Sequence, residues 1–217
     1  MSCLENYITH IRNQVNQELA AAVKKTADDI VSQYISTFSY AEHIVSLLIG
    51  DVQSGKTSHM FAVMCAAVDE GGFGDFVLLT TDNTLLQQQT FKRAQRDLKD
   101  FCVCDECDYM KFVDNDMKNP AVIVLKKNSS VLKQWRDNFS STKFCAGNPL
   151  FIIDDEADAS SLNTLVNKKE QSAINKYLSE IKRTTSSSIY MQVTGTPQSI
   201  FLQTEKSGWK PKFIYYF

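Results

Sequence analysis

The spacing of hydrophobic and polar positions changes near residue 40 of the chain. From residue 4 to residue 34, glycine and proline are absent and apolar residues recur every three or four positions, as on one face of a helix. We therefore expect an N-terminal helical segment, residues 1–40, with one or two amphipathic helices. Beyond it, short apolar runs alternate with helical patterns, which predicts a separate domain over residues 41–217.

Five apolar runs in the second part have the length and the β-branched content of buried strands. They cover residues 43–50, 75–81, 121–127, 150–154 and 188–195. Helical patterns separate them, at residues 58–70, 83–101, 129–138 and 167–183. This alternation predicts an α/β fold, in which a mainly parallel sheet is covered by helices on both faces. Residues 102–119 and 184–188 interrupt the alternation, and we place them in loops or edge structure.

A glycine-containing loop follows the first of these strands and precedes a helix. It matches the pattern GxxxxGK(S/T), in which backbone N–H groups and the helix dipole bind phosphate. Lys56 is expected to neutralise the β- and γ-phosphate oxygens, and Thr57 to bind Mg²⁺. We assign nucleotide binding to the loop and the next residue: Gly50, Asp51, Val52, Gln53, Ser54, Gly55, Lys56, Thr57 and Ser58. The alternative is an ordinary strand-to-helix turn that contains glycine.

An acidic cluster follows the strand that begins at residue 150. Four acidic residues lie within residues 154–158, and the repulsion among them favours a bound cation over a solvated turn. In P-loop enzymes a carboxylate at such a strand end holds Mg²⁺, and a neighbouring carboxylate polarises the attacking water. We expect Asp155 to be the metal ligand and Glu156 the base, with Lys56 as the second catalytic residue. Asp154 stays open as the metal contact if the register shifts by one.

The two motifs and residues 193–197 (VTGTP) resemble motifs I, II and III of the first RecA-like domain of a superfamily 2 helicase or translocase. The resemblance implies ATP and Mg²⁺ as cofactors. It also implies that four residues couple nucleotide state to motion: Asp158, Thr194, Thr196 and Gln198. Residues 155–158 spell DEAD, but DEAD-box RNA helicases usually have SAT where this chain has TGT, which argues against the RNA helicase branch.

The closer resemblance is to the Z-one domain putative-endonuclease family of bacterial restriction and defence proteins. It is carried by the stretches VQSGKTSHM, LLTTDNTLLQQQTFKR, VIVLKKNSSVLKQW, LFIIDDEAD and VTGTPQSIFLQ. It implies the ATPase core of a DNA-directed motor that works with a second RecA-like domain and a nuclease domain or partner. The chain lacks a recognisable second domain, arginine finger or nuclease motif, so by this analogy it looks truncated. We therefore expect it to bind nucleotide and to hydrolyse it slowly.

Two other functions stay open. A small-molecule kinase or another P-loop phosphotransferase would use the same loop, but the DEAD-like tetrad followed by TGTP disfavours it. A nucleotide-dependent scaffold that recruits a nuclease or another partner would bind ATP with little turnover.

Composition limits how the chain contacts nucleic acid. Of its 217 residues, 43% are hydrophobic and 22% are charged, as in a folded globular protein. The formal net charge of −2 excludes a strongly basic coat, so DNA would bind through local patches. The candidates for a surface that pairs cations with a stacking aromatic are Lys92, Arg93, Arg96, Lys126, Lys127, Lys133, Trp135 and Arg136. The alternative is a solvated helix face with a buried tryptophan.

Other signals are weaker. No apolar stretch approaches the ~20 residues that cross a bilayer, and the first 30 residues lack the features of a signal peptide. We therefore expect a cytoplasmic protein with reduced cysteines. Cys102, Cys104 and Cys107 form CxCxxC, but no fourth ligand stands at a matching spacing, and we expect free thiols rather than zinc. Glu42 and His43 are candidates for the neighbourhood of the nucleotide base.

Overall fold

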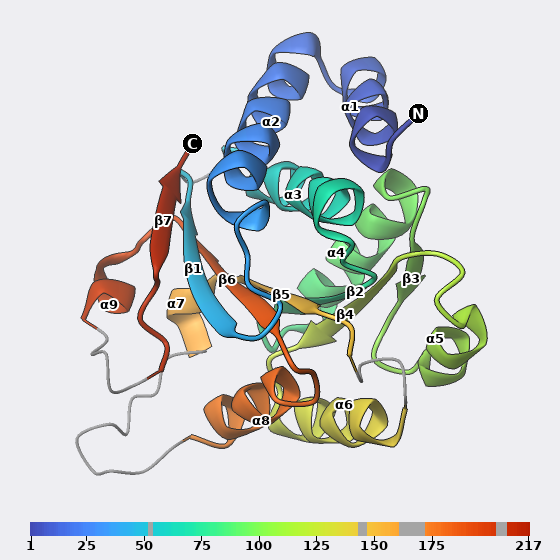
Figure 1. Cartoon of the computed structure of the whole chain (residues 1–217), viewed down its shortest axis with the longest axis vertical. Coiled ribbons are helices and arrows are strands. Elements are labelled where there is room, and N and C mark those ends of the chain that lie inside the picture. The colour runs from blue at the N-terminus through green and yellow to red at the C-terminus, as the bar shows by residue number, and fades with distance from the viewer. Residues whose placement is uncertain (52–53, 143–146, 161–171, 203–207) are drawn as a thin grey trace.

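A parallel sheet runs through the computed structural model (Figure 1). The structure describes residues 1–51, 54–142, 147–160, 172–202 and 208–217. Its seven-stranded sheet has the order β3-β4-β2-β5-β6-β1-β7, with every neighbouring pair parallel. The strands are β1 (His43–Ile49), β2 (Asp75–Thr80), β3 (Cys102–Cys104), β4 (Ala121–Lys126), β5 (Leu150–Asp155), β6 (Ser188–Thr194) and β7 (Phe213–Tyr216). The expected α/β fold is confirmed.

All five strands expected from the sequence are present, and the two others lie at the edges of the sheet. β3 falls in the segment that we placed in loops or edge structure, and it pairs with β4 alone. β7 was not expected, because its four residues are too short for a periodic signal. It becomes a strand by pairing with β1 from Ser46 to Ile49.

Helices cover both faces of the sheet (Figure 1). One face carries α1 (Cys3–Gln14), α2 (Gln17–Ile30), α3 (Lys56–Gly71) and α4 (Thr84–Asp97), and the other carries α5 (Tyr109–Asn115), α6 (Ser129–Ser141) and α8 (Ala173–Lys182). Of these, α5 was missed, because seven residues show little periodicity. The short helices α7 (Ala157–Ser160) and α9 (Gln198–Phe201) follow β5 and β6.

The N-terminal segment forms two helices that are separated by a cap. Ser2 and Glu5 make a capping box at the start of α1, and the Asn16 side chain accepts from the Leu19 N–H to begin α2. α2 continues into a π-helical turn, η1 (Val31–Ile35). Apolar residues of α1 and α2 share one core with α3 and the sheet. The N-terminal helices therefore pack on this domain.

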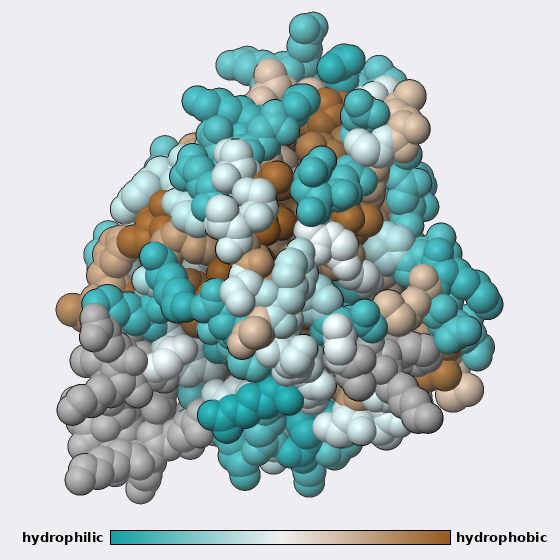
Figure 2. Space-filling view, in the orientation of Figure 1, coloured by the Kyte–Doolittle hydropathy of each residue, from teal (hydrophilic) through white to brown (hydrophobic). Residues whose placement is uncertain are grey.

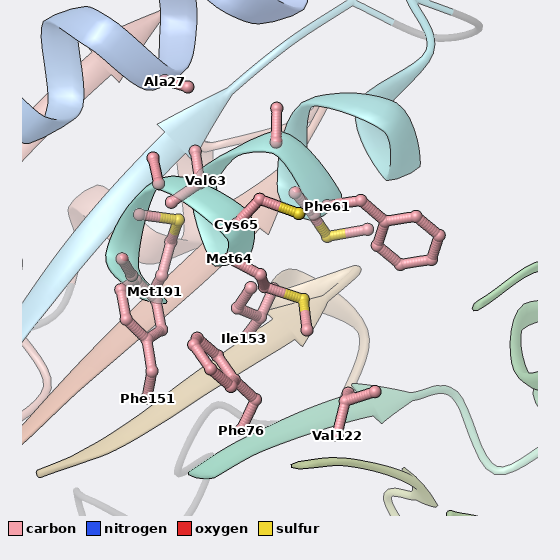
Figure 3. Packing of buried hydrophobic residues seen from close by; sticks show 14 of the residues in the cluster. Ala27, Phe61, Val63, Met64, Cys65, Phe76, Val122, Phe151, Ile153 and Met191 are labelled. Carbon is pink, nitrogen blue, oxygen red and sulfur yellow. The ribbon is translucent and has the colours of Figure 1, made fainter. Parts of the chain in front are cut away.

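The middle of helix α3 is buried on all sides rather than on one stripe. Its residues from Ser58 to Ala67 are all buried. Figure 3 shows Val63 and Met64 of this helix between Ala27 of α2 and the strand residues Phe151 and Ile153. A helix that is apolar all round belongs inside a protein. The part of α3 from Ser58 onward, close to the glycine-containing loop, is therefore held by packing.

Asp75, the first residue of β2, is a buried carboxylate that lacks a hydrogen-bond partner on one oxygen in the described structure. It is 3% exposed, and the oxygen that lacks a partner there is Oδ2. Burial raises the pKa of Asp75 to about 6. The folded protein thus binds this proton more tightly than the unfolded chain does, so the contribution of Asp75 to stability falls as the pH rises from about 4 to about 6 and is level above that.

We expect Asp75→Asn to increase the free energy of unfolding by about 1–3 kcal/mol at pH 7.5 and by less at pH 4.5, because the amide carries no charge to bury. Urea unfolding at the two pH values measures this effect. Asp114→Asn, at an exposed aspartate, serves as the control and should change stability by less than about 0.5 kcal/mol. An equal effect of Asp75→Asn at both pH values would contradict the titration.

Candidate functional site

Three adjacent strands bring the candidate motifs together. β5, β6 and β1 are neighbours in the sheet, and their carboxyl ends lie at one edge. The acidic cluster follows β5, Thr194 ends β6, and the glycine-containing loop follows β1. The Gly50 N–H donates to the Thr194 carbonyl (3.2 Å), which ties the loop to the end of β6. This edge is where parallel α/β sheets keep their ligands.

The two glycines of the loop meet different constraints. Gly55 has a φ of 79° and forms the N-cap of α3, a left-handed conformation that glycine adopts without strain. At Gly50 a Cβ atom would lie 2.1 Å from a ring carbon of Phe217, so a larger residue would displace this ring. Val52 and Gln53, also assigned to nucleotide binding, lie outside the described residues.

The Lys56 side chain curves back over the loop. Its ammonium donates to the carbonyls of Asp51 (3.1 Å) and Gly50 (3.5 Å). Lys56 opens α3, and its charge partly opposes the rise in the pKa of Asp155 that burial causes. Lys56 and the expected metal ligand therefore interact electrostatically.

The side chains next to Lys56 differ in their burial and in their hydrogen-bond partners. Thr57 and Ser54 are partly buried, and the Ser54 hydroxyl oxygen is a buried atom without a partner in the described part of the chain. Ser58 is buried, and its hydroxyl accepts from Arg93 (2.8 Å). The Ser58 side chain is thus engaged with α4.

Asp154 and Asp155 occupy different environments at the end of β5. Asp154 is fully buried and accepts from Lys127 (3.0 Å) and the Tyr190 hydroxyl (2.6 Å). The alternative in which Asp154 is the metal contact is therefore wrong, because strand alternation turns this side chain inward, where both oxygens have partners.

Asp155 is the carboxylate at the mouth of the site. Burial and the neighbouring Glu156 raise its pKa to about 6, although Lys127 and Lys56 act in the opposite direction. A carboxylate whose charge is not fully compensated fits Mg²⁺, which prefers oxygen ligands and keeps several waters.

Glu156 is exposed and lies in a strained backbone conformation. Its φ is 54°, in the left-handed region that non-glycine residues rarely adopt, and its carbonyl accepts from Lys127 (2.8 Å). Such strain persists only where the surroundings impose it, and it concentrates at functional sites.

Lys127 is the functional residue whose position we predicted wrongly. It is 0% exposed, and its ammonium donates to the Asp154 carboxylate and to the carbonyls of Asp155 and Glu156 (2.8 Å each). We had named it as a candidate for a nucleic-acid surface, with a solvated face as the alternative. Instead it lies behind the acidic cluster and holds the backbone that presents both carboxylates. One sequence signal could have indicated this position. Asp154 is an acidic residue within an apolar strand, and a buried carboxylate requires a cation beside it.

Most of the expected basic patch is engaged elsewhere. Trp135 is 0% exposed and donates to the Glu106 carbonyl, so it belongs to the core rather than to a stacking surface, as our alternative had it. Lys126 pairs with Glu106 (3.2 Å). Arg93 and Arg96 pair with Asp97, and Arg136 with Asp137 and Glu180. Lys92 and Lys133 are exposed.

The last acidic residue connects the acidic cluster to the end of β6. The Asp158 carboxylate accepts from the hydroxyls of Thr194 (2.6 Å) and Thr196 (2.5 Å). Burial opposes ionisation of Asp158, but these hydrogen bonds outweigh it and lower its pKa. Gln198 opens α9 and is exposed. Three of the four expected coupling residues are thus in direct contact.

A pocket of about 450 Å³ adjoins the loop. Its lining comes from α2, the start of α3 and the end of β7, and includes Ser54, His59 and Phe217. The His59 and Phe217 rings stack at 3.8 Å. Glu42 and His43, which we expected near the nucleotide base, lie at the opposite end of β1, ~20 Å away along the strand. That expectation was wrong.

Two further observations concern metals and membranes. The Cys102 and Cys104 sulfurs are 3.8 Å apart, and the described residues contain no group of three or more His, Cys, Asp or Glu that could hold a metal. None of the described helices is long and apolar enough to span a bilayer.

Comparison with known proteins shows the fold. No protein-family model and no curated protein match the chain, so the resemblance to the Z-one family has no support there. Solved structures that match include the Pyrococcus furiosus Hef helicase domain, with a TM-score of 0.54 and 14% identity over 87% of this chain and 37% of that one. Another is Mss116p bound to ssRNA and AMP-PNP, with a TM-score of 0.52 and 14% identity over 93% of this chain and 44% of that one. The chain therefore spans less than half of either protein and has the fold of a RecA-like helicase domain.

Proposed function

We propose that this chain is a Mg²⁺-dependent, ATP-binding and ATP-hydrolysing domain of a helicase-like protein. The observation that carries the proposal is the meeting of a GxxxxGKT loop, Asp155 and Glu156, and the Asp158–Thr194 contact at one edge of three adjacent strands. The helicase-domain fold supports the motor class over a small-molecule kinase.

Each side chain has a role that follows from its position. Lys56 binds the β- and γ-phosphate oxygens, since its ammonium already lies over the loop. Thr57 and Asp155 hold Mg²⁺, which when bound neutralises charge on the phosphate oxygens. Glu156, exposed beside them, orients and deprotonates the attacking water. The 450 Å³ pocket between α2 and β7 takes the nucleotide base, with the His59–Phe217 stack as one wall.

The partners of this domain follow from resemblance and are part of the proposal. The motifs support a DNA-directed motor that works with a second RecA-like domain and with a nuclease in restriction or phage defence. The contact of Asp158 with Thr194 and Thr196 offers a connection between the nucleotide site and β6, through which bound ATP can alter a nucleic-acid surface.

A nucleotide titration tests the proposal. We expect a fluorescent ATP analogue to bind the wild type only with Mg²⁺, and Lys56→Ala to weaken binding at least ~100-fold, because the lysine supplies the charge that neutralises the phosphates. Lys118→Ala, at an exposed lysine, is the control and should bind like the wild type. Unchanged affinity in a folded Lys56→Ala variant would refute the assignment of the loop.

The same titration distinguishes a motor from a scaffold. Single- and double-stranded DNA are added to the wild-type chain at saturating nucleotide. A change in nucleotide affinity or in turnover supports the motor, whereas binding that ignores both DNA forms supports the scaffold.

A further inference from the structure

A second pocket lies at the edge of the sheet opposite the proposed nucleotide site. It has a volume of about 210 Å³ and is formed where α8 ends and β1 begins. In Figure 1 this end of α8 lies beneath the sheet, and Figure 2 shows a hydrophilic surface over α8 and α6. Its described lining consists of His43, Ser179, Lys182, Arg183, Gly208 and Trp209.

Every ionisable group in the described lining of this pocket is basic. Lys182 is 9% exposed, and within the described ranges no carboxylate pairs with it. Its ammonium instead contacts two aromatic rings, at 4.6 Å from the centroid of Trp209 and 5.9 Å from that of Tyr190. The acids nearest in sequence are engaged elsewhere, since Glu42 pairs with Lys212 and Glu180 with Arg136.

The positive charges of the pocket are incompletely compensated. Burial, with Arg183, lowers the pKa of Lys182 to about 8, and burial with Lys182 and Arg183 lowers the pKa of His43. The carboxyl end of α8 would favour cations, but hydroxyls of Thr184 and Thr185 already donate to the carbonyls of Ile181 and Lys182. A buried cation without an acidic partner is costly unless a ligand compensates it.

We propose that this pocket binds a phosphate group, with Lys182 and Arg183 as its cationic donors and His43 as a ring that gains a proton when the phosphate binds. A phosphate there would compensate the charges of Lys182 and Arg183 and remove their mutual repulsion. The cavity is smaller than the ~300 Å³ at which sites for whole organic ligands begin, so it suits a single phosphate group rather than a nucleotide. The site is separate from the proposed ATP site and does not depend on it.

Thermal unfolding and calorimetry in phosphate-free buffer test the site. The experiments use the Lys56→Ala chain, so that phosphate held by the loop does not contribute. We expect inorganic phosphate to bind with a Kd of about 1 mM or tighter and to raise the melting temperature. Lys182→Met should abolish both effects and should itself raise the melting temperature without phosphate, because it removes a buried, uncompensated charge. Lys176→Met, at an exposed lysine of the same helix, is the control.

NMR titration of the histidines tests the site without any substitution at the pocket. In NMR titrations, phosphate should raise the pKa of His43 and leave His10 and His59 unchanged, since only His43 lines the pocket. Absence of phosphate binding, or binding that Lys182→Met leaves intact, would overturn the proposal. Competition by a 5′-phosphorylated oligonucleotide, but not by its unphosphorylated form, would identify a nucleic-acid end as the source of the phosphate, and competition by neither would indicate a small phosphate ligand.

Discussion

Replacing Lys127 by methionine is expected to destabilise the domain by about 3–5 kcal/mol, because it leaves the Asp154 carboxylate buried without its counter-charge. Both side chains are 0% exposed, so water cannot take over from the lost ammonium. The same change frees the carbonyls of Asp155 and Glu156. Nucleotide binding should weaken as well, since those two residues form the mouth of the site.

Chemical denaturation of three variants measures this effect. Lys126→Met is the matched control, because this adjacent lysine makes a more exposed ion pair worth about 0–1 kcal/mol. Adding Asp154→Asn to Lys127→Met should recover part of the loss, since the double variant no longer buries a lone charge. A loss below about 1 kcal/mol in Lys127→Met would show that the buried pair is not holding the end of β5.

Replacing Glu156 by glutamine is expected to lower ATP turnover at least ~100-fold while nucleotide affinity stays within about twofold. Glutamine keeps the size of the side chain and the backbone at residue 156, which Lys127 holds through its carbonyl. It cannot accept a proton from the attacking water. A loss confined to turnover therefore separates a base from a binding residue.

Single-turnover hydrolysis, with protein in excess over ATP, gives the rate even where turnover is slow. Glu70→Gln, at an exposed glutamate of α3, is the control and should hydrolyse ATP like the wild type. Equal rates in Glu156→Gln and the wild type would remove Glu156 as the base. A parallel fall in affinity would instead place Glu156 among the groups that hold the nucleotide.

The elements that the sequence predicts well are those whose signal is local. Strands β1, β2, β4, β5 and β6 are apolar runs that no soluble protein leaves exposed, and their alternation with helices implies parallel pairing. The loop and the acidic cluster were placed correctly after their strands, β1 and β5, for the same reason. The short elements α5 and β7 were not predicted, because so few residues give little periodic signal and their structure depends on tertiary contacts.

The positions that the sequence left open or misplaced belong to side chains whose partners are distant in sequence. Lys126 and Lys127 are adjacent lysines, yet one lies near the surface and the other is fully buried against Asp154, 27 positions away. Trp135 is likewise decided by α5 and the Glu106 carbonyl. No local pattern distinguishes a lysine that faces solvent from one that neutralises an interior acid.

The sequence by itself determined the α/β class, the positions of the main strands along the chain and the patterns of the glycine-containing loop and the acidic cluster, because period and spacing are properties of neighbouring residues. Only the tertiary structure decided that Asp154 is a structural anion, that Lys127 holds it, and that Lys182 faces a basic pocket on the opposite edge. These are statements about burial and charge compensation. They depend on which segments the folded sheet brings together, since the cost of a buried charge is set by its neighbours in space.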